Sequence, residues 1–203
     1  DLGVSTTTHR PEAFASAISH RKNGSAGRAP ATLRDPSFVA NFDRVAKAYA
    51  ARLRASGLYD FDDLLLEAVR LLTEVEDVRL AGRDRWRHVL VDEYQDTNAT
   101  QTALLKALVG EAPDLTVVGD PDQSIYRWRG ASIRNILQFG DDFPGARVVK
   151  LEENYRSTQR IVGAAEAVIA RNAQRYEKTL RTENDLGEPV GEVRSRDPVE
   201  EGQ

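Results

Sequence analysis

Two adjacent carboxylates, Asp92 and Glu93, are the residues whose types and spacing most directly suggest chemistry. They follow three branched apolar residues, Val89–Val91, and such an uninterrupted run predicts a strand buried on both faces. Ligands of open parallel sheets bind beyond the carboxyl ends of the strands. Acids placed there can hold a hydrated Mg²⁺ ion and polarise water, as nucleoside-triphosphate hydrolysis requires. The alternative is an acidic turn that is simply exposed to solvent.

A second polar cluster, residues 119–131, follows the next expected strand, Leu115–Val118. Four of its residues alternate aromatic and cationic side chains: Tyr126, Arg127, Trp128 and Arg129. Such alternation offers π-faces to bases and positive charge to phosphates, the composition of a groove for single-stranded nucleic acid. The alternative is that the two aromatic residues fill a domain interface.

A third cluster, residues 154–158, follows a third expected strand at Arg147–Leu151. It places Arg156 directly before Ser157, a residue type that commonly caps a helix. The backbone donors and the dipole of a helix start both favour a nearby anion. The arginine therefore suggests a phosphate contact, and the alternative is an ordinary surface charge.

Hydrophobic periodicity predicts the elements that position these clusters. Helices are expected at Ser37–Ser56, Asp60–Leu72, Leu80–Arg87, from a cap at Asn98 or Thr100 through Leu108 to near Gly110, at Ser132–Phe139 and at Ser157–Ile169. Residues 1–35 are weakly patterned and read as a flexible connection with one short helix at Pro11–His20. Gly57 and Gly140 read as helix breakers, and the tail after Asn184 could begin a further strand. Alternation of strands and helices predicts a parallel sheet in three layers, so the fold class is α/β.

The composition, 40 % hydrophobic and 30 % charged over 203 residues, is ordinary for a soluble protein. The net charge of −4 argues against coating of nucleic acid by bulk electrostatics but allows a local basic groove. The lack of cysteine excludes disulfides and thiolate metal sites. No apolar run approaches the roughly 20 residues of a membrane span, and no leader is recognisable, so a cytoplasmic protein without a membrane partner is expected. The lack of methionine suggests a segment of something longer.

At the three clusters the sequence resembles the UvrD/PcrA/Rep family of superfamily 1 DNA helicases. Residues Val91–Asn98 resemble its Walker B motif, Val118–Ala131 its third motif and Leu151–Thr158 its fourth. Residues Tyr59–Leu64 resemble a segment that the family places shortly before Walker B. The resemblance implies a RecA-like P-loop NTPase sheet flanked by helices, here partial, with a helical insertion on the N-terminal side.

The same resemblance implies an ATP site. Asp92 would bind Mg²⁺, and Glu93 would activate the attacking water. Gln123 would sense the γ-phosphate and couple it to the adjacent DNA loop. Tyr155 would stack on adenine, and Arg156 would reach the γ-phosphate from the second lobe as an arginine finger.

The resemblance also implies DNA as the partner, either single strands or duplex junctions. Tyr126, Trp128 and Arg129 would meet the single strand, with Trp128 stacking on a base. ATP would close two lobes, hydrolysis would reopen them, and the protein would move 3′ to 5′ in repair or replication. Tyr94 and the run Tyr126–Trp128 favour this group over the alternative of a motor segment from a helicase–nuclease recombination subunit.

The sequence departs from the family pattern in one large respect. It contains no Gly-x-x-x-x-Gly-Lys-Ser/Thr phosphate loop, and the family's upstream glutamine segment and later second-lobe motifs are missing too. The expected organisation is the end of a helical insertion subdomain (1–57), the C-terminal part of the first RecA-like lobe (58–146) and the start of the second (147–203). By itself this chain is expected to be inactive. A module that binds single strands without ATP is the remaining alternative.

Overall fold

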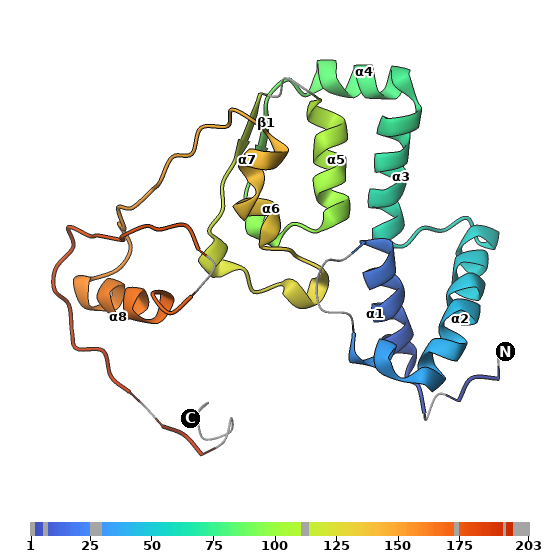
Figure 1. Cartoon of the computed structure of the whole chain (residues 1–203), viewed down its shortest axis with the longest axis horizontal. Coiled ribbons are helices and arrows are strands. Elements are labelled where there is room, and N and C mark those ends of the chain that lie inside the picture. The colour runs from blue at the N-terminus through green and yellow to red at the C-terminus, as the bar shows by residue number, and fades with distance from the viewer. Residues whose placement is uncertain are drawn as a thin grey trace. The chain divides into compact units, whose positions relative to one another are not determined.

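The computed structural model describes residues 3–5, 8–24, 30–110, 114–172, 175–192 and 194–196, without the side chain of Arg129. It divides into two units, Asp1–Pro144 and Gly145–Gln203, and each is described by itself. Within the first unit, Figure 1 shows a small sheet and a set of helices. Among the described helices, none combines the length and apolar composition that crossing a bilayer requires.

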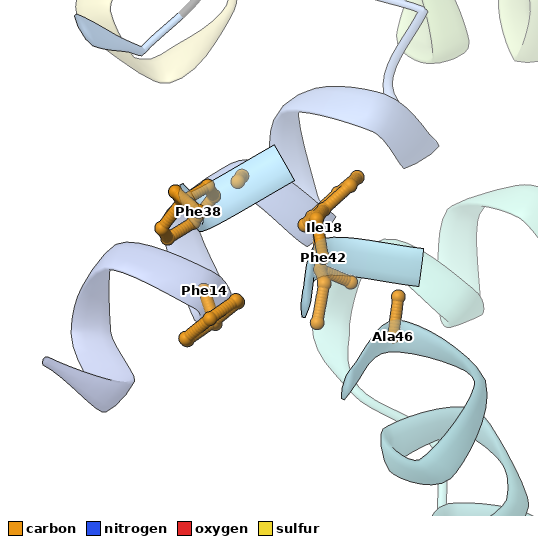
Figure 2. Packing of buried hydrophobic residues seen from close by; sticks show 6 residues of the cluster. Phe14, Ile18, Phe38, Phe42 and Ala46 are labelled. Atoms are coloured by element: carbon orange, nitrogen blue, oxygen red, sulfur yellow. The ribbon is translucent and has the colours of Figure 1, made fainter. Parts of the chain in front are cut away.

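The first unit begins with two helices, α1 (Pro11–Lys22) and α2 (Pro36–Ala55), joined in part by a 3₁₀ turn at Ala31–Arg34. Both helices confirm the sequence prediction. Their apolar faces form one core, which Figure 2 shows: Phe14, Ala17, Ile18, Phe38, Phe42 and Ala46. The rings of Phe14 and Phe38 stack with centroids 4.3 Å apart. The α2 helix ends before Gly57, whose φ of +63° suits glycine.

Two further helices, α3 (Phe61–Glu74) and α4 (Glu76–Arg85), follow as predicted, with α4 starting earlier than expected. Asp60 caps α3 in a capping box with Asp63. Lys22 of α1 pairs with both acids, at 2.7 Å from Asp60 and 2.6 Å from Asp63. Burial alone would lower the pKa of Lys22, but the hydrogen bonds to the two carboxylates outweigh it and raise that pKa. This ion-pair cluster fixes the start of α3 to the end of α1.

The sheet consists of β1 (Val89–Val91) and β2 (Leu115–Val117), which pair in parallel with Val89 opposite Leu115. Between them runs α5 (Ala99–Val109), which Asn98 caps in a second capping box. The α5 helix lies between the sheet and α3 (Figure 1). The predicted parallel β–α–β unit is therefore confirmed, although the full RecA-like sheet stays a prediction.

The expectation that Val89–Val91 is buried on both faces is wrong for the described part of the chain. The side chain of Leu90 is 78 % exposed, while Val89 and Val91 are partly buried. Side chains alternate between the two faces of a strand, so Leu90 lies on the opposite face from its neighbours. No described element of the first unit covers that face, so the predicted three-layer arrangement is incomplete within this unit.

After β2 the chain forms two 3₁₀ turns, η3 (Pro121–Gln123) and η4 (Arg127–Arg129). The single helix predicted at Ser132–Phe139 is instead two short helices, α6 (Arg134–Leu137) and α7 (Phe139–Asp142). Gln138 ends the first and precedes the second with a φ of −102°. Gly140, expected as a breaker, lies inside α7.

The second unit contains one described helix, α8 (Gln159–Ile169). Its N-cap is Thr158 rather than the predicted Ser157, and the N–H groups of Gln159 and Arg160 donate to the carbonyls of Asp185 and Leu186, at 3.1 and 3.3 Å, rather than to a capping side chain. In the preceding turn Asn154 Oδ1 accepts from the N–H groups of Arg156 and Ser157, at 3.1 and 2.8 Å. The helix therefore starts one residue later than a cap at Ser157 would place it.

The third predicted strand, 147–151, does not form. Its apolar residues Val148, Val149 and Leu151 are exposed, and the segment has no strand partner in the described part of this unit. The one bridge described here joins Glu153 to Arg181. The described residues after Asn184 form no strand either. A strand needs a neighbour for its backbone groups, so a strand-like sequence without one stays extended but unpaired.

Candidate functional site

The two acids of the first cluster, Asp92 and Glu93, lie directly after β1 and are exposed. Glu93 adopts φ +50° and ψ +42°, the only left-handed conformation of a non-glycine residue in the described chain. A left-handed residue with a Cβ atom costs roughly 1–2 kcal/mol, and such strain concentrates at functional positions. Asp92 supports the turn, because its Oδ1 accepts a hydrogen bond from the Glu93 N–H at 2.9 Å.

Gln95 ties the loop after β1 to the loop after β2. Its Nε2 donates to Glu93 Oε2 at 2.6 Å, and its Oε1 accepts from the Asp120 N–H at 3.0 Å. The neighbouring Tyr94 N–H donates to the Val118 carbonyl at 3.0 Å. Two of the three predicted clusters therefore meet at one edge of the sheet, as parallel pairing requires.

Tyr94 anchors the same turn through its buried side chain. Its side chain is buried and packs edge-on against Phe139 of α7, with ring centroids 5.4 Å apart. Burial raises the pKa of the Tyr94 hydroxyl. The acidic loop thus rests on a packed aromatic contact, so it is more than a solvated turn.

Gly119, the first residue of the second cluster, is enclosed by the same contacts. A Cβ atom there would lie 2.5 Å from Gln95 Oε1, 2.9 Å from Ile136 Cδ1 and 3.1 Å from the Tyr94 backbone nitrogen. The two loops therefore approach each other closely enough that only glycine fits. Neither Gly119 nor Gln95 had a role in the sequence prediction, although both lie inside the clusters that the sequence singled out. Both residues take part in a contact between two loops that are 24 or more residues apart in the sequence. Such a contact leaves no local pattern in the sequence.

Substituting Gly119→Ala should destabilise the first unit by about 1–3 kcal/mol, because the added methyl group overpacks this contact. Urea unfolding followed by tryptophan fluorescence measures it, since both tryptophans lie in this unit. Gly140→Ala is the matched control: its Cβ would meet nothing within 4 Å, and alanine favours the helix α7. Equal midpoints for the two variants would contradict the close approach.

The loop after β2 is organised around Asp120. Its Oδ1 accepts from the Asp122 N–H and its Oδ2 from Gln123 Nε2, both at 3.0 Å. Gln123, predicted as the γ-phosphate sensor, is thereby joined through Asp120 to the Gln95 link. The structure therefore brings Gln123 into the same hydrogen-bonded group as Glu93.

The predicted DNA-contacting residues lie in the segment that continues from this loop. Tyr126 and Trp128 have ring centroids 6.4 Å apart with planes tilted by 45°. The Trp128 side chain is 73 % exposed within its unit, so it is no part of that unit's core. The backbone of Arg129 lies in η4, but its side chain is outside the described part of the structure.

A hollow of about 420 Å³ adjoins the acids. It is lined by Asp92, Glu93 and Tyr94 on one side and by residues of α5, including Leu104 and Leu108, on the other. Among the described residues no group of three or more His, Cys, Asp or Glu is arranged to hold a metal. Mg²⁺ at phosphate sites is commonly bound through one or two carboxylates while it keeps its waters, and the exposed carboxylate of Asp92 fits that ligand chemistry.

Tyr155 and Arg156 belong to the second unit and are both exposed there. They lie in the turn that Asn154 closes, four and three residues before Gln159, where α8 begins. Asn184 holds the same turn from the other side, donating to the carbonyls of Tyr155 at 3.3 Å and Ser157 at 3.1 Å. Both side chains thus project from a turn that is fixed at its backbone.

Two family models match the chain, the UvrD/REP helicase N-terminal domain over residues 6–144 and the UvrD-like helicase C-terminal domain over residues 149–203. Similar proteins include the ATP-dependent DNA helicase UvrD1 of Mycobacterium tuberculosis (strain H37Rv), 46 % identical over 94 % of this chain and 26 % of its own length.

Two other relatives are the ATP-dependent DNA helicases PcrA of Bacillus subtilis, 46 % identical over 76 % of this chain, and Rep of Escherichia coli, 50 % identical over 68 %; each match covers 21 % of the relative. The chain thus spans about a quarter of the length of these curated relatives. Matches of this extent establish that the chain belongs to the UvrD/Rep family of DNA helicases.

Proposed function

We propose that this chain is part of an ATP-dependent helicase or translocase that moves 3′ to 5′ on single-stranded DNA in repair or replication. The observation that carries the proposal is the hydrogen-bonded joining of the two loops. Glu93 is linked through Gln95 to Asp120, which also holds Gln123. An acid suited to activating water is thereby connected to a loop that leads into an aromatic, arginine-containing segment.

In this proposal the exposed carboxylate of Asp92 would hold Mg²⁺, and the ion would supply positive charge against the phosphates. Glu93 accepts a proton from the attacking water, and Gln123 contacts the γ-phosphate. Tyr155 stacks on adenine, and Arg156 stabilises the charge that develops on the transferred phosphoryl group. Because the sequence has no phosphate loop, hydrolysis must be tested in a full-length parent protein that contains one.

The DNA side of the proposal depends on Trp128, with Tyr126 and Arg129 beside it. A tryptophan that is 73 % exposed leaves most of its ring surface available, and base stacking gives such a side chain a use. A parent protein without a phosphate loop upstream of this chain would favour the alternative, a module that binds single strands without ATP.

Trp128→Ala in the parent protein should weaken single-stranded DNA binding by about 5- to 150-fold, the equivalent of 1–3 kcal/mol of stacking. Anisotropy of a labelled oligothymidine, titrated at several salt concentrations, measures it. The salt dependence should keep its slope, because tryptophan neutralises no phosphate.

The other tryptophan, Trp86, provides the control, because it lies at the end of α4, away from the 119–131 segment in sequence. Trp86→Ala should leave DNA affinity unchanged. Unchanged affinity and unchanged DNA-stimulated ATPase in Trp128→Ala would instead indicate that Trp128 fills an interface.

A further inference from the structure

We infer that Gln95 is a positioning residue that holds the Glu93 carboxylate in place. Through Gln95, the conformation of the DNA-side loop, residues 119–124, would affect the position of that carboxylate. The inference rests on the proposed role of Glu93 as general base. It begins from burial: Gln95 is 1 % exposed, and both ends of its amide are engaged across two loops. Family resemblance had placed this residue in a motif without giving it a task.

The amide of Gln95 is the feature that makes the link possible. Nε2 must face the carboxylate of Glu93, and Oε1 must face the N–H of Asp120, so the amide has one orientation that satisfies both partners. A carboxylate in the same place could accept from Asp120 but could not donate to Glu93. An apolar side chain could do neither and would leave a buried N–H without its acceptor.

The surroundings leave the amide little freedom to move alone. The Gly119 Cα approaches Gln95 so closely that a Cβ atom would lie 2.5 Å from Oε1. The Gln95 backbone is also engaged, because its carbonyl accepts from Ser124 Oγ at 3.4 Å. A displacement of the 119–124 loop must therefore displace the Gln95 side chain or break its hydrogen bonds.

The loop in turn leads into the DNA-contacting segment. Asp120 holds Gln123 through its Oδ2 at 3.0 Å, and Tyr126 follows three residues later. DNA bound at Tyr126 and Trp128 would restrain this loop, and Gln95 would pass the restraint to Glu93. The expected consequence is that Gln95 governs how strongly single-stranded DNA stimulates hydrolysis.

The test uses the full-length protein with Gln95→Met, which keeps the side chain's length without its amide, and Gln95→Glu, which keeps only the acceptor. Both variants should lower the DNA-stimulated kcat about 10- to 100-fold, the range found when residues that orient the ligands of a catalytic metal are replaced. The KM for ATP should change by less than about 3-fold, because binding is not what is lost. Gln138→Ala, at an exposed glutamine between α6 and α7, should match wild type.

A double-mutant cycle separates positioning from a merely structural role. If Gln95 acts through Glu93, adding Gln95→Met to Glu93→Gln should reduce single-turnover hydrolysis no further, since the two residues act as one unit. Losses that multiply, or a Gln95→Met enzyme with wild-type DNA stimulation, would overturn the inference while leaving Glu93 as the base. Wild-type turnover in Glu93→Gln alone would instead overturn the proposed base, and the positioning role with it.

Discussion

Glu93→Gln in the full-length protein should bind ATP as tightly as wild type and lose turnover by about 10²–10⁴-fold, the range that general-base catalysis supplies. The amide keeps the size of the side chain but cannot accept the proton of the attacking water. The backbone of Glu93 also points to a functional position. Its φ of +50° after β1 is a left-handed conformation that costs free energy in folding, and such strain clusters at functional sites. Equilibrium binding of ATP and phosphate release under DNA-saturated conditions measure the two quantities.

The matched control is Glu12→Gln, because Glu12 is an exposed acid in the first turn of α1. It should leave both ATP binding and turnover unchanged. Undiminished hydrolysis in Glu93→Gln would refute the general-base role. Equal losses of ATP affinity and turnover would show that Glu93 serves binding rather than the chemical step.

The local elements of this chain were predictable because their signals are local. The helices α2, α3 and α5 follow from amphipathic spacing, and Asp60 and Asn98 cap the last two as residues of their types commonly do. The short helix α1 was expected within a weakly patterned stretch. The parallel pairing of β1 and β2 followed from the helix between them. Each of these predictions needed only residues within one element or one connection.

The features that the sequence did not predict depend on partners elsewhere. The exposure of Leu90 and the unpaired segment 147–151 are set by whether a neighbouring element covers or pairs them, which the strand's own residues do not encode. The left-handed backbone of Glu93 has no signal in a glutamate. The hydrogen bond from the Asp120 N–H to Gln95 joins residues 25 positions apart, so the link between the loops became visible only once both loops were placed.

Of the site, the sequence placed the first two clusters directly after two expected strands, and in the structure Gln95 joins them by hydrogen bonds to Glu93 and Asp120. The third cluster is different in kind. Tyr155 and Arg156 lie in a unit described by itself, so their roles in adenine stacking and phosphoryl transfer stay predictions. Kinetic measurements on the parent protein test these two roles.

Arg156→Ala in the full-length protein should lower ATP turnover by about 10³–10⁵-fold, the effect of removing an arginine finger, with single-stranded DNA affinity unchanged. Arg156→Lys should recover little of this loss, because an ammonium group lacks the planar fork that pairs with phosphate oxygens. The backbone turn should survive both substitutions, because Asn154 holds it through the Arg156 N–H rather than through the side chain. Steady-state ATPase and anisotropy titrations measure the two quantities.

Arg171→Ala is the control within the same unit, because Arg171 is an exposed arginine just beyond the other end of α8. A transition-state contact predicts that only Arg156 matters and that kcat falls while the KM for ATP stays nearly constant. An ordinary surface charge predicts small and similar effects for both arginines, reduced further by added salt. The second pattern would remove Arg156 from the proposed site and leave Glu93, Gln95 and Gln123 as its proposed members.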